Sequence, residues 1–166
     1  IDGDKKGGWT DQGAKNDLSV FPLEQKMFAG MEFKIIDPDT NGGKSCMMFK
    51  GPERDYFIEK AQIKAGKKAK YIYILHSSAW TPPKGVAGRI NINYSDKTTE
   101  TIPVSTEKDV GEWWGADELE NGKIGWFASN KGGTYVGVFV SKYSNPRPEK
   151  LIDNFSSSPG SGYFTE

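Results

Sequence analysis

Tyr71-Ile72-Tyr73-Ile74-Leu75 (YIYIL) is the most strand-like stretch of the sequence. β-Branched and aromatic residues favour an extended backbone, and a run this short is typical of a strand rather than a helix. The run is apolar at every position instead of every second one, which is the pattern of a strand buried on both faces. We therefore expect residues 70–77 to form a central strand. The run Tyr135-Val136-Gly137-Val138-Phe139-Val140 has the same character and predicts another central strand at 135–143.

The sequence around these two runs consists of short apolar or alternating segments separated by turn signals. Ile90, Ile92 and Tyr94 alternate with asparagines, so they should share one face of a strand at 89–94. Ser95-Asp96-Lys97 is a short turn, and it predicts a hairpin with a strand at 98–104. Further strands are expected at 31–36, 45–49, 56–63, 123–128 and 151–156. About nine or ten short strands without a long amphipathic helix predict an all-β fold, a single antiparallel β-sandwich or jelly roll over residues 1–166.

The charge balance limits the classes of partner. The 166 residues carry 22 lysines and arginines against 22 acidic residues. A nucleic-acid or membrane-surface partner is not expected, because both favour a basic excess. The local cluster Lys64, Lys67, Lys68 and Lys70 is interpreted as a solvated turn between two strands. The chain contains no apolar run long enough for a transmembrane helix, and it begins without methionine, so we expect a fragment of a larger protein.

Catalytic chemistry finds little support in the sequence. His76 is the only histidine, and at the end of a strand it is interpreted as a hydrogen-bonded structural residue. No Gly-X-Ser-X-Gly motif accompanies it. The single cysteine, Cys46, lies among apolar residues and is expected to be a small buried residue. We expect a protein that is not an enzyme, with a small hydrolase as a remote alternative.

Five phrases in order along the chain carry a resemblance to a known class of module. They are Gly8-Trp9-Thr10-Asp11-Gln12-Gly13-Ala14-Lys15-Asn16-Asp17, Leu75-His76-Ser77-Ser78-Ala79-Trp80, Gly88-Arg89-Ile90-Asn91-Ile92-Asn93-Tyr94-Ser95-Asp96, Trp113-Trp114, and Asn145-Pro146-Arg147-Pro148-Glu149-Lys150-Leu151-Ile152. This series resembles the galactose-binding-domain-like β-sandwich modules of bacterial extracellular glycoside hydrolases and related polysaccharide-processing proteins. The resemblance covers residues 9–157.

The resemblance implies a non-catalytic jelly roll that binds carbohydrate at the cell surface or outside the cell. One departure concerns the C-terminus. In such modules another apolar strand usually follows the Asn-Pro-Arg-Pro segment, whereas this chain stops at Gly162-Tyr163-Phe164-Thr165-Glu166. We therefore expect an incomplete last strand.

Aromatic side chains are the first candidates for a carbohydrate site, because a flat apolar ring can pack against the C–H face of a pyranose. Trp113 and Trp114 are adjacent, so one is expected to be buried and the other to lie near the surface, where it either binds a ligand or pins a loop. Trp80 either caps the core or lines the edge of the sandwich. Trp126 is expected in the core, and Trp9 is expected to pin the N-terminal segment.

Polar candidates complete the predicted site. Arg89 could donate its planar guanidinium to a hydroxyl or an acid, or form a surface ion pair. The N-terminal segment is dense in oxygen donors, and the resemblance implies a structural calcium ion, for which Asp11, Asn16 and Asp17 are the candidate ligands. The alternative for these three residues is that they form turns by bonding their own backbone. The leading hypothesis is an accessory carbohydrate-binding module, and the alternative is a module that packs against a neighbouring domain or partner protein.

Overall fold

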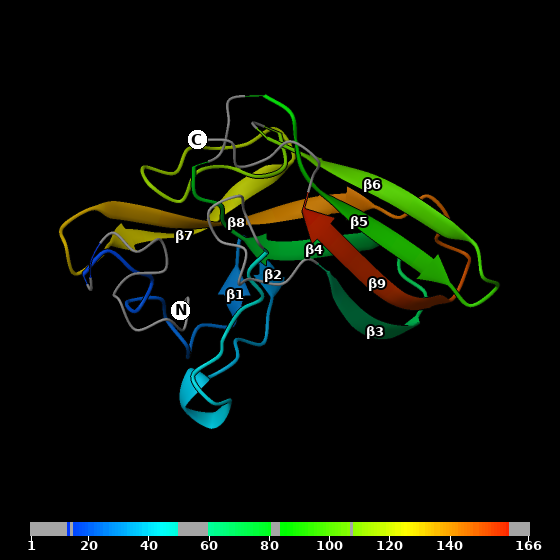
Figure 1. The fold of residues 1–166 in the computed structure, drawn as a ribbon, viewed down its shortest axis with the longest axis horizontal. Coiled ribbons are helices and arrows are strands. Elements are labelled where there is room, and N and C mark those ends of the chain that lie inside the picture. The colour runs from blue at the N-terminus through cyan, green and yellow to red at the C-terminus, as the bar shows by residue number, and fades with distance from the viewer. Residues whose placement is uncertain (1–12, 14, 50–59, 81–83, 107, 160–166) are drawn as a thin grey trace.

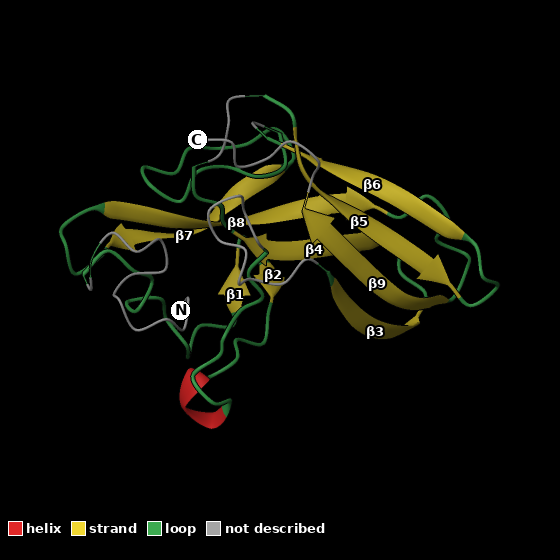
Figure 2. Cartoon of the chain, viewed as in Figure 1, coloured by secondary structure: helices red, strands yellow, loops and turns green. Residues whose placement is uncertain are grey.

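The fold is built from three antiparallel sheets (Figures 1 and 2). The computed structural model describes residues 13, 15–49, 60–80, 84–106 and 108–159. Strands β1 (Met27–Phe28) and β2 (Met31–Glu32) form a small ribbon. A four-stranded sheet has the order β3 (Ala61–Lys67), β9 (Ile152–Pro159), β5 (Val86–Tyr94) and β6 (Thr99–Ser105). A three-stranded sheet has the order β4 (Tyr71–His76), β8 (Tyr135–Ser144) and β7 (Gly122–Ser129).

This architecture confirms the predicted all-β fold with antiparallel sheets and is consistent with a β-sandwich. Apart from strands and turns, the described residues contain one short 3-10 helix, η1 (Pro38–Thr40). Across the described residues no helix is long and apolar enough to span a membrane. Trp9, Asp11 and the segment at 162–166 lie outside the described residues.

The alternation predicted for β5 is confirmed. Ile90, Ile92 and Tyr94 are buried, with exposed fractions of 5%, 0% and 1%. The predicted hairpin is also confirmed, because β5 pairs with β6 from Asn93 opposite Thr99 onwards. The inner faces of the two larger sheets meet at one apolar cluster, in which Ile92, Tyr94 and Ile152 pack with Ile72 of β4. The sandwich core therefore lies between these two sheets.

β8 is the central strand of its sheet, as predicted, whereas β4 is not. Residues 136–141 of β8 are buried without interruption. Among the described residues β4 pairs only with β8 and forms the edge of the three-stranded sheet, so its predicted central position is wrong. An apolar run indicates that the faces of a strand are covered, and it does not indicate whether both edges of the strand are paired. In this sheet, other segments cover β8 and its neighbours. Phe28 packs over Gly125 on one face, and Leu119 packs over Gly122 on the other.

Three strand predictions in the first half of the chain need correction. β2 ends at Glu32 rather than at residue 36, and residues 45–49 form no strand beyond a single bridge at Phe49. The strand predicted at 56–63 lies partly outside the described residues, and its described part belongs to β3, which continues to Lys67. Gly66, with a φ of 62°, lies at a bulge within β3 rather than in the turn after it.

The predictions for the lysine cluster and for Cys46 are wrong, because the strands begin and end at other residues. Lys64 and Lys67 lie on β3 and not in a turn. Cys46 is exposed, because the segment around it is not a core strand.

Candidate functional site

Trp113 and Trp114 lie in the connection between β6 and β7, and the structure separates their roles. Trp113 is 1% exposed and belongs to the core with Val136, whereas Trp114 is 40% exposed. The two rings meet edge to face, with centroids 5.4 Å apart. The backbone N–H of Gly137 donates to the Trp113 carbonyl at 2.7 Å and ties this segment to β8. The prediction of one buried and one surface tryptophan is confirmed.

Trp80 lies on a segment that runs beside the tryptophan pair. Ser78 pairs in parallel with Glu112, and the Trp113 N–H donates to the Ser78 carbonyl at 2.8 Å. Trp80 itself is 47% exposed and has a φ of 54°, a left-handed backbone conformation that is uncommon for a bulky residue. Of the two predicted positions, the edge of the sandwich fits this exposure. The predicted core residue Trp126 is half-buried and packs against the Trp113 cluster.

Phe127 of β7 and Tyr135 of β8 form an exposed stacked pair that the sequence analysis missed. Their rings are 5.4 Å apart and nearly parallel, at 11°, and they are 45% and 60% exposed. Phe127 pairs with Gly137, and Tyr135 lies two residues before it, so the two rings stand on the same face of the sheet. No clear signal in the sequence pointed to this pair, because β8 is apolar at every position from 135 to 140 and β7 carries a register shift between Ile124 and Trp126.

The segment after Trp114 joins the stacked pair to the tryptophans. The Gly115 N–H donates to the Tyr135 carbonyl at 3.0 Å, and Gly115 has a φ of 62°. Ala116 then packs onto Gly137, so closely that a Cβ at 137 would lie 2.5 Å from the Ala116 Cβ. Only glycine at 137 allows this approach. Four exposed aromatic residues thus belong to neighbouring segments at one end of the three-stranded sheet, and we call them the aromatic surface: Trp80, Trp114, Phe127 and Tyr135.

The structure does not bring Arg89 to the aromatic surface. Its neighbour Ile90 faces the core, so Arg89 lies on the outer face of the four-stranded sheet. That face carries a ladder of polar hydrogen bonds: Thr101 Oγ1 donates to Asn91 Oδ1 at 2.7 Å, and Asn93 Nδ2 donates to Asn154 Oδ1 at 2.8 Å. Arg89 therefore lies on the same face of the sheet as this polar ladder and not at the site with the tryptophans.

The candidate calcium ligands take part in turn and loop contacts. An Asp17 carboxylate oxygen accepts from the Ser19 N–H at 3.0 Å, which fits the alternative of a backbone-bonding turn. Asn16 Oδ1 instead accepts from the side chain of Asn130, at 3.2 Å from Nδ2, and so contacts the loop between β7 and β8. In the described part of the chain, no group of three histidine, cysteine or acidic side chains could hold a metal ion. Because Asp11 lies outside the described residues, the calcium site stays a prediction.

His76 forms a buried hydrogen-bond relay, as expected for a structural histidine. The Ser141 hydroxyl donates its one proton to the Asp109 carbonyl at 2.5 Å, so it must accept from His76 Nε2, 2.7 Å away. Nδ1 is then the unprotonated nitrogen, and it is buried without a partner among the described residues. Burial lowers the pKa of His76 to about 4 and outweighs the opposing effect of the Asp109 carbonyl. The ring is neutral at physiological pH.

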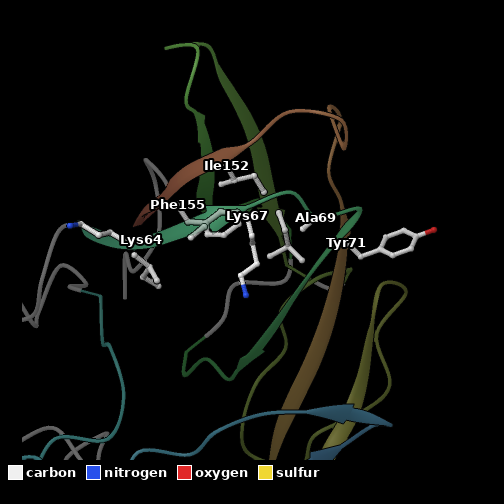
Figure 3. Close-up of a pocket in the computed structure, with 9 residues that line it drawn as sticks. Lys64, Lys67, Ala69, Tyr71, Ile152 and Phe155 are labelled. Carbon is white, nitrogen blue, oxygen red and sulfur yellow. The ribbon is translucent and has the colours of Figure 1, made fainter.

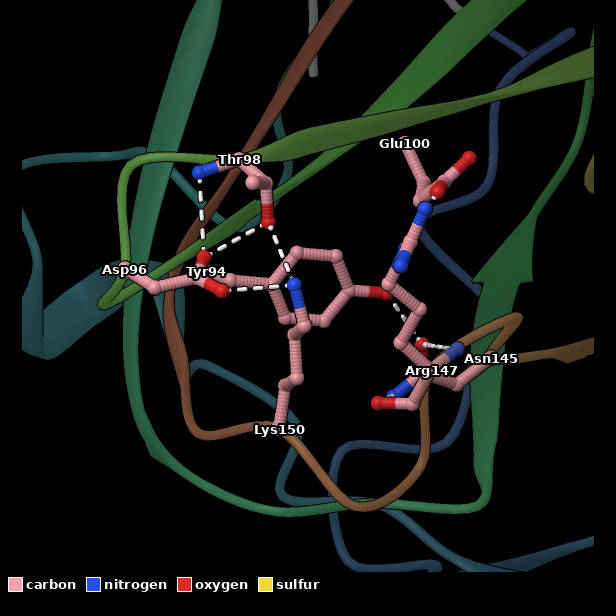
Figure 4. Close-up of polar contacts among 7 residues, drawn as sticks. All are labelled: Tyr94, Asp96, Thr98, Glu100, Asn145, Arg147 and Lys150. Atoms are coloured by element: carbon pink, nitrogen blue, oxygen red, sulfur yellow. Dashed lines mark hydrogen bonds and ion pairs between the residues drawn. The ribbon is translucent and has the colours of Figure 1, made fainter.

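A second polar cluster surrounds Tyr94 at the hairpin end of the four-stranded sheet (Figure 4). The buried Tyr94 hydroxyl donates to Asn145 Oδ1 at 2.5 Å. Asn145 Nδ2 in turn donates to the Ala69 carbonyl at 2.7 Å, so this amide connects the two sheets. Lys150 Nζ lies 2.5 Å from a carboxylate oxygen of Asp96, and this contact holds the pKa of Asp96 well below its ordinary value. The cluster holds together the loops at this end of the two sheets.

Comparisons with protein-family models, curated proteins and solved structures find no match for this chain.

Proposed function

We propose that this chain is a non-catalytic carbohydrate-binding module, a galactose-binding-like jelly roll that serves an extracellular carbohydrate-active protein. The aromatic surface is its proposed binding site. The observation that carries the proposal is the stacked pair of Phe127 and Tyr135, which leaves two large rings 45% and 60% exposed on one face. Exposed rings of this size cost free energy in water unless a partner covers them.

The chemistry of the surface suits a sugar ring. A pyranose presents an apolar C–H face that packs on an aromatic ring, and hydroxyls that need polar partners at the ring edge. Asp117 is exposed and directly follows Ala116, which packs beside Phe127. Its carboxylate is available as a hydrogen-bond acceptor at the margin of the stacked pair.

The loop that presents Tyr135 is held in place before any ligand arrives. Asn130 is buried, and its side-chain oxygen accepts from the N–H groups of Gly132 and Thr134 at 2.9 and 3.0 Å. Gly132 also donates to the Lys15 carbonyl at 3.0 Å. A surface that is already ordered loses less conformational entropy on binding.

The test is a glycan-array screen with purified protein, in calcium and in chelator. Trp114→Ala and Tyr135→Ala each remove one exposed ring. Tyr71→Ala is the matched control, because Tyr71 is an exposed aromatic of β4 that is not part of the aromatic surface. Trp113 is left intact, because replacing this buried ring by alanine would cost about 3–5 kcal/mol of folding free energy.

A glycan bound by wild type and by Tyr71→Ala, and lost by the folded Tyr135→Ala protein, supports the proposal. Binding that survives loss of both exposed rings places the site elsewhere, and no binding across a broad array rejects the function. A fall in binding with chelator supports a calcium ion in the module, and equal binding argues against a calcium requirement.

The alternative function, packing against a neighbouring domain or partner protein, draws on the same exposed rings. It predicts no glycan binding, together with burial of Tyr135 and Phe127 in a longer version of the protein. Hydrogen–deuterium exchange of β7 and β8 in both lengths of chain distinguishes the two functions, because only the packing function predicts protection on adding the neighbour.

A further inference from the structure

A groove opens between the edge strands of the two sheets, away from the aromatic surface (Figure 3). It lies beside β3, β4 and β9, and its volume is about 340 Å³. Six of the residues that line it are apolar: Ile63, Ala65, Ala69, Ile72, Ile152 and Phe155. The remaining lining residues are Lys64, Lys67 and Tyr71. We call it the lysine groove.

β3 places a cation on the apolar side of the sheet. Alternation along the strand puts Ile63, Ala65 and Lys67 on the inner face and Lys64 on the outer face. The pairing agrees, because Lys67 lies opposite Ile152, which is a core residue. In Figure 3 the Lys67 amine extends toward the space beside β4, whereas the Lys64 amine points away from it.

Two other lysines lie near Tyr71 but do not line the groove. Lys142 Nζ lies over the Tyr71 ring, 3.8 Å from its centroid, and Lys70 Nζ lies 5.4 Å from the same centroid, but this ring points away from the groove in Figure 3. Within the described residues, none of the ion pairs involves Lys64, Lys67, Lys70 or Lys142. The apolar wall is also left in water, since Ile63 is 46% exposed. An apolar groove with the amine of Lys67 at its edge complements a ligand that has an apolar body and an anionic head.

We propose that the lysine groove binds a small anionic amphiphile, an aliphatic chain that ends in a carboxylate of the fatty-acid type. The aliphatic chain packs between Ile63, Ile72 and Phe155, and the carboxylate pairs with Lys67. The volume lies near the lower end of small-molecule sites, which suits a single chain. A peptide added as an extra strand fits less well, because lysines on an edge strand such as β3 oppose pairing with another strand.

The test measures binding of dodecanoate by titration calorimetry, at concentrations below micelle formation. Dodecylammonium carries the opposite charge on the same chain, and dodecyl maltoside carries no charge. Lys67→Gln removes the proposed partner of the head group, and Ala65→Leu fills the groove. Lys123→Gln is the control, because Lys123 is an exposed lysine of β7, which does not line the groove. Thermal unfolding verifies that each variant folds.

We expect dodecanoate to bind better than either other probe, and more weakly as salt is added. Lys67→Gln should weaken dodecanoate binding about tenfold, as loss of a charge-assisted hydrogen bond does, and leave dodecyl maltoside unchanged. Ala65→Leu should weaken binding of every probe that enters, while Lys123→Gln should bind as wild type does.

Equal affinity for the anionic and cationic probes would overturn the proposal, as would dodecanoate binding that neither groove variant changes. A wild-type protein that binds none of the probes also overturns it. If sedimentation shows a dimer that Ala65→Leu dissociates, a second copy of the chain covers the groove and the amphiphile is excluded. These outcomes are independent of the glycan array, because the lysine groove and the aromatic surface share no residue.

Discussion

The lone histidine should make the stability of this protein depend on pH in a window that can be stated in advance. The folded state keeps His76 neutral, with a pKa of about 4, against 6.5 for an ordinary histidine. Below pH 6.5 the unfolded chain takes up a proton that the folded chain refuses, so the free energy of unfolding falls as pH decreases. The loss is complete once pH is below the folded pKa.

The size of this loss follows from the two pKa values. One proton of difference between the states changes stability by about 1.4 kcal/mol per pH unit. Between 6.5 and about 4 the sum is about 3 kcal/mol, which is a large part of the stability of a small domain. The structural cause is specific, because a proton on Nδ1 would be buried with no acceptor among the described residues.

The assay is urea unfolding at half-unit steps from pH 7.5 to pH 4.5, followed by tryptophan fluorescence. His76→Gln is the reference, because glutamine keeps a donor for the Ser141 oxygen but does not titrate. The carboxylates are common to both proteins, so the difference between their stabilities isolates the histidine. NMR titration of the single imidazole gives its pKa independently.

The wild type should lose stability faster than His76→Gln as pH falls from 6.5. Parallel stability curves for the two proteins, or an imidazole that titrates near 6.5 in the folded state, would refute the assigned relay. Either result would mean that the Nδ1 atom reaches solvent or a proton acceptor.

Three further perturbations have definite expected results. Tyr94→Phe removes the buried hydroxyl that bonds Asn145 and should lower the free energy of unfolding by about 1–2 kcal/mol in urea titrations. An unchanged unfolding midpoint would show that this hydrogen bond does not contribute to stability. Gly137→Ala should lower the free energy of unfolding by about 1–3 kcal/mol, because the new methyl group meets Ala116. Adding Ala116→Gly should restore part of that stability. A double variant that is no more stable than Gly137→Ala would contradict this contact. Lys150→Met should raise the pKa of Asp96 toward its ordinary value, because the ammonium is the largest cause of its depression, and a carboxyl resonance that titrates as before would disprove the pairing.

Local patterns in the sequence predict the strands of the second half of the chain well. The alternation of Ile90, Ile92 and Tyr94 fixes both the strand and its buried face, because a half-buried strand needs period two. Pairing is less predictable. The run at Tyr71 is apolar at every position, yet it forms an edge strand whose residues are half-buried or exposed, because hydrophobicity carries no information on whether the neighbouring edge is occupied.

The candidate site was predictable only in part. Because Trp113 and Trp114 are adjacent, the sequence was enough to predict that one is buried and the other exposed, since neighbours in an extended segment face opposite ways. The Phe127–Tyr135 stack depends on the register of β7 and β8, which includes a shift between Ile124 and Trp126. Registers arise from contacts distant in sequence, so a single chain does not reveal which aromatic residues meet.

The position of β9 has a consequence for how the protein is made. This strand is the last in the described chain, yet it lies between β3 and β5. While a ribosome is still translating residues before 152, β5 can pair with β6, but β3 has no strand to pair with and cannot join the sheet. Assembly of the four-stranded sheet must wait for β9, so we expect a slow folder that depends on contacts far apart in sequence and exposes unpaired strand edges until residues 152–159 have been synthesised.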